Sequence, residues 1–108
     1  MQKNIMRQMQ KMQQKMQTDM AKAQKDLEEA TVEGTAGGGA VKVVVTGAQE
    51  VKSVKISKEA VDPEDVETLE DLVLTAINNG LDKSRELSTQ RMGKVASGLG
   101  LPPGLGLF

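Results

Sequence analysis

Residues 2–30 carry apolar side chains at the spacing of an α-helix. Steps of three and four residues separate Ile5, Met9, Met12, Met16, Met20, Ala23, Leu27 and Ala30. Most of the other positions hold good helix formers, and neither Gly nor Pro interrupts the segment. The pattern predicts one helix about 40 Å long. No other segment of this short chain is long enough to cover the whole apolar stripe, so we expect the distal half to meet a second copy, to project as an arm, or both.

Residues 31–57 change to patterns that are typical of β-strands. The strand candidates are residues 31–36, 40–46 and 50–57, and they are separated by glycines 37–39 and by Gly47-Ala48. They predict a three-stranded antiparallel meander. Val43, Val44 and Val45 place apolar groups on both faces of the middle strand, so we expect one face to pack on a helix and the other to meet a subunit partner.

Residues 62–92 predict a second helix. Asp62 suits the N-cap, Pro63 suits the first helical position, and the acidic residues that follow suit the positive end of the helix dipole. Asn78-Asn79-Gly80 is a weak point at which this helix can bend, because Gly costs about 1 kcal/mol relative to Ala inside a helix. The buried stripe is expected to comprise Val66, Leu69, Val73, Ala76, Ile77 and Leu81.

Residues 93–108 predict a tail punctuated by Gly and Pro. Together with the preceding elements, the pattern predicts a single α+β domain spanning residues 1–108, with the order α-β-β-β-α. Its parts are a basic projecting helix (1–30), a β-meander (31–57), a second helix (62–92) and the tail (93–108).

The first 18 residues hold four basic side chains, Lys3, Arg7, Lys11 and Lys15, and no acidic ones. Steps of four residues drift by only about 40° around a helix, so all four emerge on one side. Cations at a helix N-terminus are disfavoured by the dipole, so the arrangement suggests an anionic partner. We predict that these four residues bind that anionic partner, with Arg91 and Lys94 as minor contributors; the alternative is that the row is simply a solvated face. The formal net charge of the whole chain is only −1, but this local asymmetry matters more.

The composition excludes several kinds of chemistry. The chain has no Cys and no His, so disulfides, Cys/His zinc sites and Ser–His or Cys–His catalytic pairs are absent. Six acidic residues between positions 62 and 71 suit helix capping and solubility better than a carboxylate or metal site. Glycines 37–39 lack the Gly-Lys-Ser/Thr of a phosphate loop. We therefore expect no catalysis, no cofactor, no metal and no small-molecule substrate.

The sequence has no apolar run of 18 residues that would predict a membrane-spanning helix, and its N-terminus lacks the apolar core of a secretory signal. We therefore expect no membrane partner, and the absence of Cys suits a cytoplasmic protein.

Specific motifs follow one another in a recognisable order. A helix rich in Met, Gln and Lys precedes Gly38-Gly-Ala-Val-Lys-Val-Val-Val-Thr-Gly47 and Val51-Lys-Ser-Val-Lys-Ile56. A Leu-Glu-Asp-Leu block then lies at 69–72, and Pro-Pro-Gly at 102–104. Over nearly its whole length the chain resembles the YbaB/EbfC family of bacterial nucleoid-associated proteins. Asn79-Gly80 departs from the Asp-Ala that is usual in that family.

The resemblance implies an intertwined, tweezer-like homodimer with projecting helical arms, located in the nucleoid of the cytoplasm. It implies binding to double-stranded DNA without catalytic activity, through a helical region that corresponds to Lys3, Arg7, Lys11 and Lys15. An alternative from the residues alone is a coiled-coil interaction module that binds a protein partner through the Met-rich helix.

Overall fold

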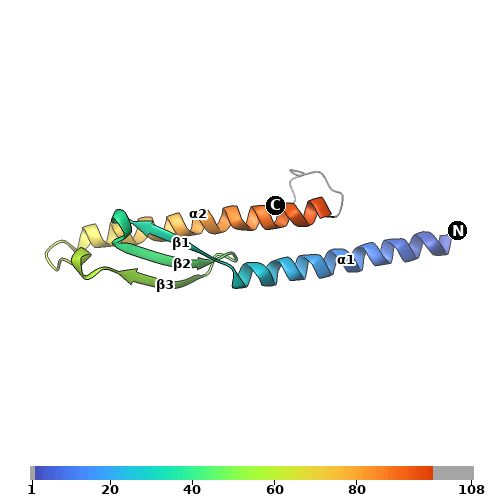
Figure 1. The fold of residues 1–108 in the computed structure, drawn as a ribbon, viewed down its shortest axis with the longest axis horizontal. Coiled ribbons are helices and arrows are strands. Elements are labelled where there is room, and N and C mark those ends of the chain that lie inside the picture. Colours follow the sequence, from blue (N-terminus) through green and yellow to red (C-terminus); the bar gives the residue numbers. More distant parts are fainter. Residues whose placement is uncertain (1, 99–108) are drawn as a thin grey trace.

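The computed structural model describes residues 2–98 as an elongated molecule of 77 × 22 × 16 Å. The element order is α1 (Gln2–Glu29), β1 (Thr31–Ala36), β2 (Val41–Thr46), β3 (Val51–Ile56) and α2 (Val66–Gly98). Short 3-10 turns at Gly37–Gly39 and Lys58–Ala60 complete it. Figure 1 shows the sheet and the first part of α2 at one end, while α1 projects toward the other. The α+β class and the α-β-β-β-α order expected from the sequence are confirmed.

The sheet is an antiparallel meander in the order β1-β2-β3. Val41, Val43 and Val45 of the middle strand are fully buried, and Ala36 of β1 joins them in the core. The β1–β2 turn passes through Gly37, Gly38 and Gly39, all with positive φ, which is why three glycines stand there. The strand bounds match those predicted from the sequence to within one residue.

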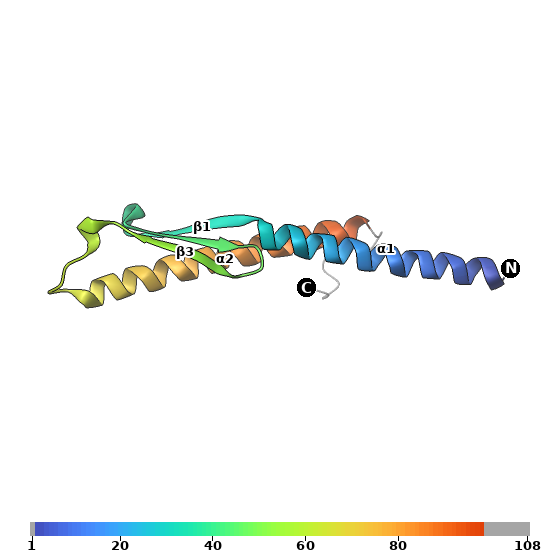
Figure 2. The same ribbon diagram turned by 90° about the horizontal axis from the view of Figure 1, so that it is seen from below.

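Helix α2 packs across β1 and β2 through Ala76, with Leu69, Leu72, Val73, Ile77 and Leu81 around it. Figure 2 shows the helix running along the sheet in a second layer. The contact is closest where Gly80 of α2 meets Gly34 of β1. A Cβ on Gly34 would lie 2.2 Å from the Ala76 carbonyl oxygen and 2.4 Å from the Gly80 nitrogen. The two glycines therefore permit backbone-to-backbone contact between helix and strand.

Asn79 and Lys83 bind the outer edge of β1. The Thr35 N–H donates to Asn79 Oδ1 at 3.1 Å, and Lys83 Nζ donates to the Glu33 carbonyl at 2.9 Å. These bonds satisfy backbone groups that an edge strand leaves unpaired. Asn79-Gly80, which the sequence marks as a weak point, is instead a contact site within one continuous helix.

The bounds predicted for the second helix were wrong at both ends. Asp62 and Pro63 form a turn that the Asp65 N–H closes onto the Asp62 carbonyl at 2.9 Å, with Pro63 at the position that turns favour. Asp65 is the cap, because its carboxylate accepts from the Thr68 N–H at 3.4 Å and the Thr68 hydroxyl at 2.6 Å.

At its other end α2 does not stop at residue 92, and residues 93–98 are helical rather than tail. Ala96 is buried and Val95 half-buried, and this packing outweighs the cost of Gly93 in the helix. The rest of the predicted tail, residues 99–108, lies outside the described residues.

The base of α1 is fixed to the body of the molecule. Ala23 and Leu27 are buried, whereas the apolar side chains from Ile5 to Met16 are exposed. Gly47 accommodates this packing, because a Cβ there would lie 2.7 Å from Leu27 Cδ2. The Gly47 N–H also donates to the Ala30 carbonyl at 2.9 Å. The N-terminal half of α1 thus projects as an arm, one of the outcomes expected from the stripe.

An uncovered apolar strip lies on β3 rather than on the face that carries Val44. Across the sheet, Val54 pairs with Val43 and Ile56 with Val41, so both point to the helix side. Helix α2 does not reach them, and Val51, Val54 and Ile56 stay 40–43% exposed. Val44 instead pairs with Glu33 and Ser53, which are polar. The expectation that a partner meets the Val44 face therefore loses its basis.

Candidate nucleic-acid interface

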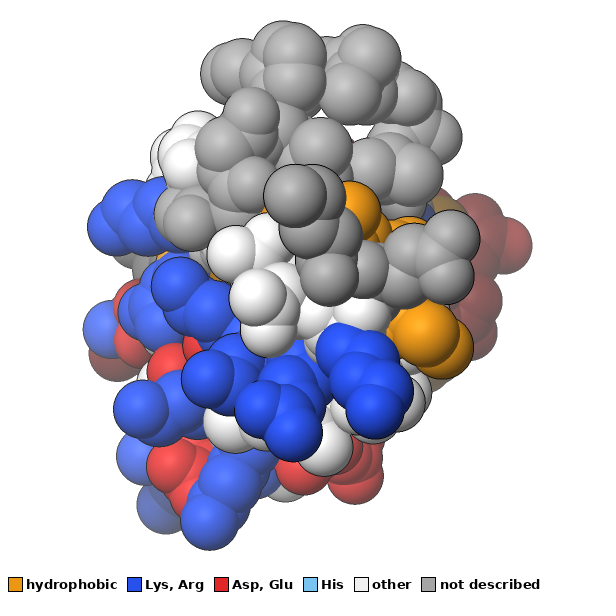
Figure 3. Space-filling model, turned by 90° about the vertical axis from the view of Figure 1, so that its right-hand side faces the viewer, with side chains coloured by type: hydrophobic (Ala, Val, Ile, Leu, Met, Phe, Trp, Pro, Cys, Tyr) orange, Lys and Arg blue, Asp and Glu red, His pale blue; other side chains and the backbone are white. Residues whose placement is uncertain are grey.

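The four basic residues predicted to bind DNA line one side of the α1 arm. Lys3, Arg7, Lys11 and Lys15 are all solvent-exposed. In the part of the chain that the structure describes, the one salt bridge joins Arg85 to Asp82, so no carboxylate neutralises this row. Viewed along the long axis, Lys and Arg side chains gather on one side of the molecule, and hydrophobic side chains appear on another (Figure 3). The four exposed cations of the row are therefore open to an anionic partner.

Two more cations, Lys22 and Lys25, continue this row toward the body of the molecule. They were not among the binding residues predicted from the sequence. Both are exposed. At 100° per residue they fall within about 40° of the middle of the row. Their angular position on the helix was a sufficient signal. The neighbouring acids Asp19, Asp26 and Glu29 obscured it, because the prediction relied on a segment without acidic residues. We use the name basic face for Lys3, Arg7, Lys11, Lys15, Lys22 and Lys25.

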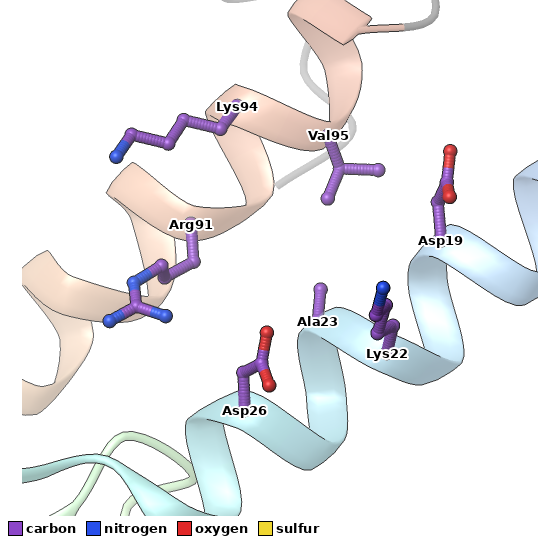
Figure 4. Close-up of a pocket in the computed structure, with 7 residues that line it drawn as sticks. All are labelled: Asp19, Lys22, Ala23, Asp26, Arg91, Lys94 and Val95. Atoms are coloured by element: carbon purple, nitrogen blue, oxygen red, sulfur yellow. The ribbon is translucent and has the colours of Figure 1, made fainter.

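A groove of about 440 Å³ separates the base of α1 from the end of α2. Its lining mixes charges: Asp19, Lys22 and Asp26 come from α1, and Arg91 and Lys94 from α2 (Figure 4). Ala23 and Val95 form its apolar floor. The cations outnumber the acids by only one here, so the groove is a weaker anion site than the arm. Arg91 and Lys94, predicted as minor contributors, lie in this groove and not on the basic face.

The acidic residues near the start of α2 act in local structure. Asp62 Oδ1 accepts from the Glu64 N–H at 3.0 Å, and Asp65 caps the helix. Within residues 2–98 no three acidic side chains converge in a way that would hold a metal ion. Neither helix of this described region has the length and apolar character needed to cross a membrane.

Comparison with known proteins decides the family. The model of the YbaB/EbfC DNA-binding family matches residues 1–99. This chain belongs to that family. The resemblance drawn from the sequence motifs is confirmed.

Curated relatives of the YbaB/EbfC family agree. A "Nucleoid-associated protein" of Ruminiclostridium cellulolyticum is 50% identical over 102 residues, which cover 94% of this chain and 85% of that protein. One of Syntrophobacter fumaroxidans is 53% identical over 94 residues, covering 83% and 86%. One of Bacillus cereus is 56% identical over 87 residues, covering 81% and 80%. All three relatives carry the name nucleoid-associated protein.

A solved structure shares the fold. The crystal structure of an uncharacterized protein from Helicobacter pylori superposes with a TM-score of 0.69 at 21% identity. The match covers 85% of this chain and 94% of that one. The match shows that the same fold forms from a distant sequence, since packing of a meander on a long helix depends on pattern more than on residue identity.

Proposed function

We infer that this chain is a nucleoid-associated protein that binds double-stranded DNA through the basic face of α1, with no catalytic step. The observation that carries this is a row of exposed cations on a projecting helix with no acid paired to them. A helix of this length, about 42 Å, follows roughly one turn of duplex. The contacts are mainly to phosphate, because Lys and Arg without aromatic wedges carry little base information. The family and the names of its relatives support this function.

The proposed unit is a homodimer that places two basic faces around one duplex. Support comes from Val51, Val54 and Ile56, an apolar strip beside α2 that this chain alone leaves exposed. A second copy that covers the strip would remove it from water at about 25 cal/mol per Å². In this proposal residues 1–108 form a single domain in each subunit of the dimer. The coiled-coil module, the alternative interpretation, finds no support in the family or its relatives.

The salt dependence of binding tests the phosphate mechanism. Each phosphate that the protein neutralises releases counterion, so log affinity falls with log salt by about 0.9 per contact. With part of the two basic faces engaged at once, we expect a slope of about −3 to −6 on random-sequence duplex. Fluorescence anisotropy between 50 and 300 mM salt measures it. A slope near zero, or binding restricted to one sequence, would contradict a phosphate-dominated mechanism.

The dimer surface is tested by Val54→Lys. An ammonium placed on the strip has to be desolvated without a partner on association, so we expect the variant to be monomeric at micromolar concentration. Ser53→Lys is the matched control, since the same side chain then emerges on the opposite, polar face of β3. Light scattering and circular dichroism separate dissociation from unfolding. A folded, dimeric Val54→Lys variant would show that the partner surface lies elsewhere.

A further inference from the structure

The arm has a second face, opposite its cations, that nothing in the described part of the chain covers. Ile5, Met9, Met12 and Met16 form this Met stripe, and they are 58%, 58%, 63% and 43% exposed. At 100° per residue the stripe is centred about 150° around the helix from the middle of the row Lys3–Lys15. When the basic face binds DNA, the Met stripe therefore points away from the duplex and stays available.

The spacing of the Met stripe is the same read in either direction. Its steps are four, three and four residues, so Ile5 and Met16 are equidistant from the centre, as are Met9 and Met12. An antiparallel two-fold pair of arms would set Ile5 of one against Met16 of the other, and Met9 against Met12. Such self-complementarity is what an isologous interface requires. The steps also match the heptad spacing of paired helices, which the following step to Met20 breaks.

The flanks of the Met stripe also suit a pair of identical arms. Gln8 and Gln13 lie about 70° to either side of the centre of the stripe. Lys15 lies about 90° from the centre, on the same flank as Gln8. In an antiparallel two-fold pair, Lys15 of one arm lies about 3 Å along the axis from Gln8 of the other, and the two Lys15 residues are about 13 Å apart. No like charges therefore meet at the flanks, and Lys3, Arg7 and Lys11 point away from the pair.

We propose that the Met stripe is a docking surface for the Met stripe of a second copy, paired antiparallel, so that two DNA-bound proteins bridge two duplexes. The bridging part rests on the proposed DNA binding. The surface area that one arm segment can bury is smaller than the roughly 1,600 Å² buried in a standard stable interface. A single pair is therefore weak, and bridging arises where many copies lie along neighbouring duplexes at high local concentration.

Cysteine cross-linking tests the pairing directly, because the chain has no native cysteine. Full-length Ile5→Cys and Met16→Cys proteins are mixed on duplex DNA under oxidised glutathione. The proposed pair brings these two positions within disulfide reach, whereas two copies of position 5 lie about 16 Å apart along the axes. We expect the mixed disulfide to exceed the Ile5→Cys self-product by about ten-fold, given this steep geometric requirement. Gln17→Cys is exposed and lies about 100° or more from both the Met stripe and the row Lys3–Lys15, so it gives the collision background.

Three outcomes of the cross-linking would overturn the proposal. Self-products as abundant as the mixed one would indicate parallel arms within a single dimer. Mixed product no higher than the Gln17→Cys background would mean that the arms do not pair. An intrachain disulfide between Met12→Cys and Leu105→Cys, in place of the arm-to-arm product, would show that the chain's own C-terminal segment occupies the stripe.

A second experiment separates bridging from DNA binding. Beads carrying one duplex capture a labelled second duplex in the presence of wild type or of Met9→Gln/Met12→Gln, which keeps every charge and a good helix former. We expect the variant to bind a single duplex within about two-fold of wild type and with the same salt slope, since it keeps all the phosphate contacts. Capture of the second duplex should fall by about five-fold or more, because avidity between arms is lost.

The two experiments distinguish failure of the proposed DNA binding from failure of bridging through the Met stripe. If wild type binds no DNA, the proposed function fails, and the cross-link without DNA still decides whether the arms pair. If single-duplex binding is intact and capture by the variant is unchanged, bridging through the Met stripe is wrong. If Met9→Gln/Met12→Gln dissociated the homodimer proposed above, the Met stripe would lie inside that homodimer. This result would also overturn the proposal.

Discussion

Replacing Arg7 and Lys11 by alanine is expected to weaken DNA binding by roughly 10- to 100-fold at physiological salt, because the lost phosphate contacts remove counterion release worth about 1.4 to 2.7 kcal/mol in total. In a dimer the double variant removes four of the twelve cations of the two basic faces. The salt slope should flatten by about a third, and the loss should be equal on all sequences. The fold should persist, because both positions are exposed and Ala is the best helix former.

The matched control is Lys52→Ala/Lys55→Ala, which removes the same number of exposed charges from β3 and none from the arm. We expect the control to keep both its affinity and its salt slope. Anisotropy titrations of the two double variants, with circular dichroism for folding, make the comparison. Equal losses in both would show that total charge, and not the basic face, governs binding. Loss on one sequence alone would show that Arg7 and Lys11 contact bases.

The largest expected effect on stability belongs to Gly34→Ala. A Cβ at this position would lie 2.2 Å from the Ala76 carbonyl oxygen and 2.4 Å from the Gly80 nitrogen. Both neighbours are backbone atoms within α2, so the strain cannot be relieved by a side-chain rotation. Helix and strand have to separate, and we expect a loss of about 3 kcal/mol or more, the upper range for overpacking. That corresponds to a melting temperature lower by roughly 10–20 °C.

Gly93→Ala is the control for Gly34→Ala. It introduces the same methyl group into α2, where nothing lies within 4 Å of the new Cβ. Because Ala favours a helix interior by about 1 kcal/mol over Gly, this variant should melt at a higher temperature than wild type. Thermal denaturation followed at 222 nm measures both variants. A Gly34→Ala protein as stable as wild type would show that α2 and β1 do not approach as closely as described.

The local elements of this protein follow from its sequence. The run of β-branched residues in 40–46, between three glycines and Gly47, predicts the middle strand almost to the residue, because strand propensity and turn chemistry are properties of adjacent residues. The helical period of Ile5 to Leu27 predicts α1 for the same reason. The row Lys3, Arg7, Lys11 and Lys15 was also visible, since helix geometry alone determines which side chains share a side.

The tertiary structure decided what depends on residues far apart in the chain. The helix continues past Gly93 because Val95 and Ala96 find packing there. Asn79-Gly80 looks like a weak point until β1 lies against it. The apolar strip on β3 stays exposed because one helix is too narrow to cover three strands. The pattern of neighbouring residues in the sequence cannot show this, because it depends on the width of the packed elements.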